Sequence, residues 1–136
     1  MQNVIGRYLK KYQDWFYVVF RVFVGLLFFQ HGAQKLFGWF GSAGTAESLS
    51  LFWFAGVIEV VGGLFLAAGV FTRLVAALGA LEMVVAYFKV HNPVGLIPIV
   101  NKGELALLFL AAFLIIAVEG ARKASLELAV SKKEMF

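Results

Sequence analysis

The chain has 136 residues, of which 62% are hydrophobic and 15% charged, whereas a soluble domain is about 45–50% apolar and about 25% charged. A domain of this size leaves much of its surface exposed, so the composition excludes an ordinary water-soluble protein and favours one embedded in a lipid bilayer. The formal charge of +4 does not indicate a nucleic-acid partner, because the basic residues flank the apolar segments, and the lack of cysteine excludes disulfides and thiol relays within the chain.

The N-terminal segment, residues 5–12, has apolar residues at helical spacing opposite three basic residues. This pattern is typical of a short helix at the membrane surface, although a disordered basic tail fits it equally well. The apolar segment that follows is longer than the hydrophobic region of a secretory signal, and the first small-residue site suited to cleavage lies beyond Gly41. We therefore expect this segment to be retained.

Four apolar segments follow one another at residues 15–37, 51–71, 74–90 and 103–120. A membrane-spanning helix needs about 20 residues and at least about 17, so the first segment is long enough and the last two are marginal. None of the segments alternates with a period of two, and helices satisfy their own backbone hydrogen bonds in lipid. The sequence thus predicts an all-α, integral membrane four-helix bundle that forms one domain over residues 1–136.

The connections support these boundaries. Residues 38–48 are rich in Gly and Ser, as expected for an external loop. Gly69 is expected to cap the second helix. Both prolines lie within residues 91–103, so the third helix should end before Pro93.

The basic residues predict the orientation. The two tails and the turn at Arg73 share one side and contain about eight Lys or Arg, whereas the other side has Lys35, Lys89 and Lys102. Because cytoplasmic flanks of membrane helices are rich in Lys and Arg, we expect both termini to be cytoplasmic.

Charged residues within the predicted spans need partners. An ionised group near the bilayer centre costs about 2.5–3.5 kcal/mol, so Arg21, Glu59 and Glu82 should point into the bundle. Small residues flank Glu59 on its helix, which indicates a face for close helix packing. One interpretation of these residues is therefore structural: buried ion pairs that fix the register of the helices.

The other interpretation is a functional site in the outer half of the bundle. Ionisable residues from several helices fall at similar depth there: His31, Lys35, Glu59, His91 and Glu104. Such a set around an apolar cavity is typical of a proton-handling site. A di-metal bundle would need Glu-x-x-His on two helices, which the sequence lacks, and two histidines suit haem even less, so we expect no metal.

Four stretches carry a resemblance to a known family: RVFVGLLFFQHGAQKLFG, GVIEVVGGLFLAAGVFTRLVA, LEMVVAYFKVHNPVGLIPIVNKGELALLFL and EGARKASLE. Together they resemble the DoxX family of small membrane proteins over about residues 21–127. The family commonly closes with Gly-Pro-Gly and Ser-Leu-Asp, where this chain has Gly-Ala-Arg and Ser-Leu-Glu. The rigid turn of the family is thus missing at the end predicted to be cytoplasmic.

The resemblance implies a quinone-linked redox role. The family name comes from subunits similar to those of a thiosulfate:quinone oxidoreductase, and other members look like partners of oxidative-stress enzymes. Aromatic residues near the polar cluster would suit a flat quinone headgroup, although at 16% aromatic content such neighbours are expected by chance. The aromatic residues in question are Phe37, Phe40, Tyr87 and Phe88.

We therefore predict a quinone-interacting subunit of a redox assembly in a bacterial inner membrane. His31 and Lys35 would hydrogen-bond a quinone carbonyl, and Glu59 and Glu104 would supply or accept protons. Other residues expected to bind the quinone are Gln34, Glu82, Tyr87 and His91. Electrons would come from another subunit or a substrate, and the expected partners are lipid, a redox enzyme subunit and a second copy of the chain.

Two further functions stay open. The chain could be a non-enzymatic assembly or scaffold subunit whose polar core locks the bundle. It could also be a small proton-coupled carrier, which with four helices would have to work as an oligomer.

Overall fold

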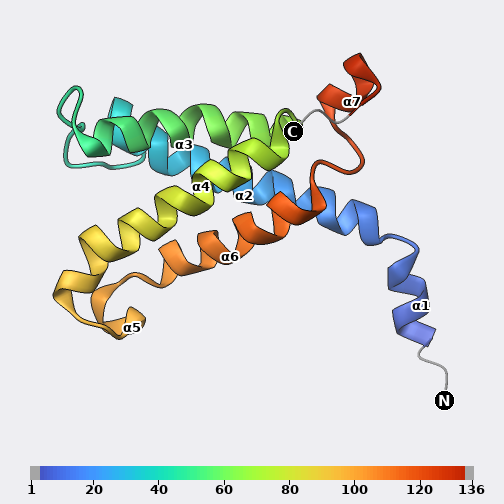
Figure 1. The fold of residues 1–136 in the computed structure, drawn as a ribbon, viewed down its shortest axis with the longest axis horizontal. Coiled ribbons are helices and arrows are strands. Elements are labelled where there is room, and N and C mark those ends of the chain that lie inside the picture. Colours follow the sequence, from blue (N-terminus) through green and yellow to red (C-terminus); the bar gives the residue numbers. More distant parts are fainter. Residues whose placement is uncertain (1–3, 134–136) are drawn as a thin grey trace.

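A computed structural model describes residues 4–133, and Figure 1 shows their arrangement. Within this range all regular elements are helices, as predicted. The body consists of α2 (Gln13–Phe37), α3 (Leu51–Ala68), α4 (Thr72–Ala86) and α6 (Glu104–Glu119). The shorter elements are α1 (Val4–Lys10), the π-helix η1 (Tyr87–His91), the 3₁₀ turn η2 (Asn92–Val94), α5 (Pro98–Asn101) and α7 (Leu126–Ser131).

The long helices begin and end close to the predicted segments, and their caps explain why. Ser50 accepts a hydrogen bond from the Trp53 N–H at 3.2 Å and so starts α3. Gly69 ends α3 as predicted, with a φ of 71° that favours glycine. The third helix ends before Pro93, as predicted, but after Ala86 it widens into η1, and Pro93 lies inside the 3₁₀ turn η2 that follows. Proline is tolerated there because the first N–H groups of a helical turn have no partner to lose.

Glycines bring α2 and α3 into close contact along most of their length. A methyl group on Gly32 would lie 2.6 Å from the backbone nitrogen of Val60, and one on Gly25 would lie 2.6 Å from the carbonyl oxygen of Gly63. Only glycine fits at such distances, so the two backbones touch directly, as in many membrane helix pairs.

A second pair, α4 and α6, packs through larger side chains. Gly79 of α4 makes room for the ring of Phe113 on α6. Phe113 in turn meets Phe28 of α2, with ring centroids 4.8 Å apart, and stacks on Phe109 at 5.7 Å. These rings form the buried centre in which α2, α4 and α6 meet.

The two pairs diverge toward one end of the molecule. In Figure 1 they lie close together where α3 turns into α4, and they splay apart toward the loop of residues 38–50 and α5. We call the end with residues 38–50 and 87–103 the loop end, and the opposite end, with α1, α7 and the α3–α4 turn, the terminal end. The apolar faces of the long helices are largely exposed, as expected for side chains that face lipid.

Three helical stretches among the described residues are long and apolar enough to cross a membrane: Gln13–Phe37, Leu51–Ala68 and Thr72–Val94. With 16 residues, α6 is roughly 24 Å long at about 1.5 Å per residue. It is therefore shorter than the hydrocarbon core of about 30 Å. A fourth span and the cytoplasmic position of both termini stay predictions, and residues 1–3 and 134–136 lie outside the described residues.

Arg21 holds the terminal end together. Its side chain is fully buried, and the guanidinium donates to the carbonyl oxygens of Ala121 and, at 2.8 Å, Ala124. Ser125 adds a hydrogen bond to the carbonyl of Gly69 at 2.7 Å. These contacts fasten the segment after α6 onto α2 and α3, which favours a structural role for Arg21.

Candidate functional site

The centre of the site is an ion pair between α2 and α3. Lys35, in the last turn of α2, donates from Nζ to Oε1 of Glu59 on α3. The Glu59 side chain is 3% exposed and that of Lys35 is 29% exposed, so the carboxylate is buried and the ammonium reaches toward the surface. Gly56, one turn before Glu59, leaves room for Leu36 and Lys35, because a Cβ there would lie 2.9 Å from the Leu36 Cγ and 3.2 Å from the Lys35 Cβ.

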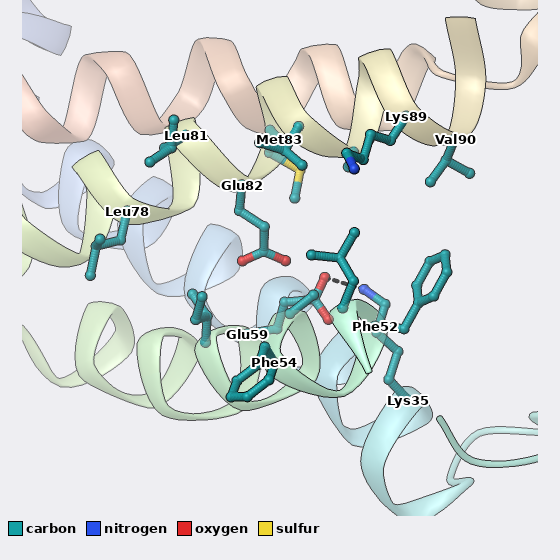
Figure 2. A pocket seen from close by; sticks show the side chains of 15 residues that line it. Lys35, Phe52, Phe54, Glu59, Leu78, Leu81, Glu82, Met83, Lys89 and Val90 are labelled. Atoms are coloured by element: carbon teal, nitrogen blue, oxygen red, sulfur yellow. Dashed lines mark hydrogen bonds and ion pairs between the residues drawn. The ribbon is translucent and has the colours of Figure 1, made fainter. Parts of the chain in front are cut away.

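A second carboxyl group faces this pair from α4. Figure 2 shows the Glu82 side chain pointing across the gap between α4 and α3 toward Glu59. The Oε2 atoms of Glu59 and Glu82 are both buried without a hydrogen-bond partner among residues 4–133. Two carboxylates and one ammonium carry a net charge of −1, and one proton on either carboxyl makes the cluster neutral. Since buried net charge is costly in a membrane, the cluster is suited to hold such a proton.

An apolar cavity of about 270 Å³ opens beside this cluster, between α3 and α4. We call it the α3–α4 cavity. Its polar side chains are those of Lys35, Glu59, Glu82 and Lys89, and its other walls include Phe52, Phe54, Leu78, Leu81 and Val90 (Figure 2). The cavity thus joins a charged wall to apolar walls on two helices that are long and apolar enough to cross a membrane.

A second cavity of about 210 Å³ reaches the ion pair from the other side. We call it the histidine cavity, since His31 of α2 and His91 of η1 both line it, together with Lys102 and apolar residues of α4 and α6. The His31 ring stands edge-on to Phe109, with centroids 5.8 Å apart. Nδ1 of His91 lies 3.0 Å from the carbonyl oxygen of Asn101. A carbonyl only accepts, so this nitrogen carries the hydrogen and donates it.

Comparison with known proteins gives the family. The family model for DoxX matches residues 16–92. The chain belongs to the DoxX family. It is 35% identical to an uncharacterized protein of Haemophilus influenzae over 133 residues, which is 92% of this chain and 98% of that protein. It is 30% identical to the Bacillus subtilis protein named "Putative oxidoreductase CatD" over 116 residues, 81% of this chain and 83% of that protein. No solved structure matches.

In this DoxX family membrane protein, the structure brings together part of the predicted site. Lys35, Glu59 and Glu82 form one cluster, and His31 and His91 line the cavity behind it. All five come from the stretch that matches the DoxX model.

The other predicted residues lie elsewhere. Gln34 lines shallow hollows at the loop end, one of them next to Lys35 and another next to His31. The Tyr87 hydroxyl donates to the carbonyl of Leu96 at 3.2 Å and so orders the loop after η1. Glu104 is exposed at the start of α6 and lines neither cavity. The aromatic walls also differ from expectation: Phe52 and Phe54 line the α3–α4 cavity, whereas Phe37, Phe40, Tyr87 and Phe88 line neither cavity.

Three polar residues near the site were missing from the prediction. Lys89 lies seven residues after Glu82, two helical turns along the same face; this spacing is visible in the sequence, but Lys89 was not named as a site residue. Lys102 lines the histidine cavity from a loop, where no periodicity applies. Asn101 is buried, donates to the Gly95 carbonyl at 2.7 Å and accepts from the Gly103 N–H at 2.7 Å. These hydrogen bonds order the loop that carries Lys102 at the histidine cavity.

Proposed function

We propose that this DoxX family protein is a quinone-interacting subunit of a redox assembly in a bacterial inner membrane, and that the α3–α4 cavity takes the quinone headgroup. One observation carries the proposal: an ion pair and a second buried carboxyl group form one wall of an apolar cavity that opens between α3 and α4. A quinone supplies two-electron chemistry in which two protons are taken up or released.

The residues of the cavity suit such a headgroup. The Lys35 ammonium can donate a hydrogen bond to a carbonyl oxygen, and the unpartnered Oε2 atoms of Glu59 and Glu82 can accept or, when protonated, donate one. Phe52 and Phe54 provide apolar contacts for a flat ring. A volume of about 270 Å³ is near the lower end of small-molecule pockets, which is enough for the ring while the tail stays in lipid.

Electrons must come from outside the chain. The sequence contains no cysteine, so a thiol pair of its own cannot deliver them. A redox cofactor of another subunit, or an external substrate, would be the donor. The name of the Bacillus subtilis relative, which describes an oxidoreductase, supports a redox role.

The test is quinone binding to the purified protein in lipid nanodiscs. We expect ubiquinone or menaquinone to co-purify, and added quinone to bind saturably. Glu59→Gln and Lys35→Met should each weaken binding by about tenfold or more, since each removes one charge-assisted hydrogen bond worth about 1.5–3 kcal/mol. Glu119→Gln and Lys132→Met are matched controls, because both residues lie at the terminal end and line neither cavity. Unaltered binding in both cavity variants, or no binding at all, would overturn the proposal.

The second function, a scaffold subunit with a structural polar core, has support of its own. The Lys35–Glu59 pair joins the same two helices that the glycine contacts hold together. If Glu59→Gln and Lys35→Met dismantle the fold and any partner complex to the same degree as they reduce quinone binding, the scaffold function is favoured. If fold and partner binding persist while quinone binding is lost, the quinone site is favoured.

A further inference from the structure

The Lys35–Glu59 pair separates two cavities of different character. Both cavities are lined by Lys35 and Glu59 together with Met83 and Ala86. The α3–α4 cavity lies between two helices whose outer faces are apolar. The histidine cavity lies between α2, α4 and α6 and ends at Lys102, an exposed residue of the loop end.

The lining of the histidine cavity favours water over lipid. His31, His91 and Lys102 face it from three different segments, and an exposed lysine at its mouth requires an aqueous boundary. Water molecules need two to four polar partners in a cavity. The two imidazoles, Lys35, Glu59 and Lys102 provide such partners in the lining of this cavity.

We propose that the histidine cavity is a water-filled route that carries protons between the aqueous phase at the loop end and the Lys35–Glu59 pair, while the α3–α4 cavity admits its ligand from the lipid. The entry of a ligand into the α3–α4 cavity depends on the proposed function, whereas the water-filled proton route does not. The ionisable groups that face the route are His31 and Lys35 of α2, Glu59 of α3, His91 of η1 and Lys102, with Glu82 and Lys89 on the α3–α4 side.

His31 is the residue best placed to pass the proton. It lies one helical turn before Lys35 on the same face of α2 and lines the same cavity. A neutral imidazole both donates and accepts a hydrogen bond, so it can take up a proton on one nitrogen and release one from the other. The packing against Phe109 holds its ring in the cavity wall.

Single cysteines test the water route directly, because the chain has none of its own. Ala106 lines the histidine cavity and Ala55 the α3–α4 cavity, whereas Ala33 is fully buried and lines neither. All three lie within about 6 Å of the loop end of their helices, at about 1.5 Å per residue, so depth does not distinguish them. The probes are a charged, membrane-impermeant methanethiosulfonate and a lipid-soluble maleimide, each applied to the protein in vesicles.

We expect Ala106→Cys to react with the charged reagent at least tenfold faster than Ala55→Cys or Ala33→Cys. Ala55→Cys should react mainly with the lipid-soluble maleimide. With Lys102→Glu added, Ala106→Cys should react faster with a cationic reagent and more slowly with an anionic one, because the charge at the mouth is reversed. If Ala106→Cys reacts no faster than Ala33→Cys, the route does not exist. If Ala55→Cys reacts with the charged reagent as fast as Ala106→Cys, the two cavities are not separated as proposed.

Infrared spectroscopy tests the proton path. A protonated carboxyl group has a C=O stretching band that shifts on transfer into D₂O, and the band should disappear in Glu59→Gln or Glu82→Gln. In His31→Leu we expect the shift to be at least tenfold slower than in the unaltered protein, and in His31→Gln intermediate, because glutamine can still hold water. Exchange that is equally fast in His31→Leu, or the absence of any such band, would overturn the proton route.

Neither experiment needs a quinone. If quinone binding fails while the labelling pattern and the exchange rates hold, the water route stands and the ligand of the α3–α4 cavity is a different one. If quinone binds but Ala106→Cys is unreactive, the proposed function stands without this route.

Discussion

At the scale of single residues, the Lys35–Glu59 pair shows how a membrane protein keeps a buried charge. Glu59 is 3% exposed, so its carboxylate depends on the lysine for compensation. The lysine is partly exposed and has a long apolar stem, so it keeps contact with polar surroundings at the loop end. The pair is therefore asymmetric, and loss of Lys35 should have different consequences from loss of Glu59.

Lys35→Met leaves the buried Glu59 carboxylate without its cation and should lower the free energy of unfolding by about 3 kcal/mol. The double variant Lys35→Met/Glu59→Leu removes both charges and should be distinctly more stable than Lys35→Met alone. Unfolding in mixed micelles, followed by circular dichroism, measures both. If the double variant is as unstable as the sum of the two single variants, the pair is not coupled.

The sequence predicted this pair and its neighbours because ionisable residues in apolar helices stand out and must find one another. It could not predict which residues form the cavity walls. Phe52 and Phe54 carry the same side chain as Phe37 and Phe88, so the sequence does not distinguish them. The divergence of α4 from α3 (Figure 1) decides which aromatic rings face the gap between these two helices. Glu104 was grouped with the site by depth alone, whereas its exposure depends on the rotation of α6. A helix that is apolar between its two terminal glutamates does not reveal that rotation.

At the scale of helices, the contact between α2 and α3 depends on the absence of side chains. Gly32→Ala would place a methyl group 2.6 Å from the backbone nitrogen of Val60, and backbone atoms cannot move aside as a flexible side chain can. We expect it to lower the free energy of unfolding by about 1–3 kcal/mol and to weaken the Lys35–Glu59 contact one turn further on. The control is Gly44→Ala, where nothing lies within 4 Å, and stability should change by less than about 0.5 kcal/mol. Equal stabilities of the two variants would contradict this account.

Some helix ends followed from the sequence because they carry a local signal, such as Gly69 after α3 or Pro93 after η1. The π-helix η1 carries no such signal. It widens the helix where Tyr87 and His91 turn toward the loop that Asn101 orders, so it reflects tertiary contacts that no local pattern contains.

At the scale of the whole molecule, Arg21 joins three parts of the chain that are distant in sequence. Its guanidinium donates to the carbonyl oxygens of Ala121, Lys123 and Ala124. At 3.4 Å it also donates to that of Ala67 on α3. Here the chain has Arg122 and Ala124 at positive φ, close to where the DoxX pattern has glycine and proline. The guanidinium thus holds in place a turn whose residues do not favour it.

Arg21→Lys should release this turn, because an ammonium cannot form the planar fork of hydrogen bonds that reaches several carbonyls at once. We expect residues 120–131 to become at least tenfold more sensitive to limited proteolysis in micelles, while α2–α6 stay folded. Arg7→Lys, on the exposed helix α1, is the matched control and should leave the digestion rate unchanged. An unaltered cleavage rate in Arg21→Lys would show that other contacts hold the segment.

Whether α6 crosses the membrane decides the topology of the whole chain. Three stretches qualify as spans by length and composition, and an odd number of crossings would put the two termini on opposite sides. However, α6 runs back along α4, and Arg73 at the start of α4 donates to the carbonyl of Ala117 near the end of α6 at 2.9 Å. The two helices therefore share the terminal end, which favours the prediction that α6 returns across the bilayer despite its length. The mismatch of a few ångströms costs little, because the bilayer thins locally around short helices.

This arrangement predicts the sidedness of three exposed positions. In intact cells, a membrane-impermeant maleimide should label Ala43→Cys in the loop of residues 38–50, but not Lys10→Cys on α1 or Ala129→Cys on α7. All three should react once the cells are permeabilised, which controls for their reactivity. Labelling of Ala129→Cys together with Ala43→Cys in intact cells would mean three crossings, and labelling of Lys10→Cys and Ala129→Cys alone would reverse the orientation. The labelling pattern also places the mouth of the histidine cavity relative to the cytoplasm, since the loop of residues 38–50 and the α5 region lie at the same end of the molecule (Figure 1). The direction of proton movement through that cavity thus depends on which side the basic terminal end occupies, and its excess of Lys and Arg favours the cytoplasm.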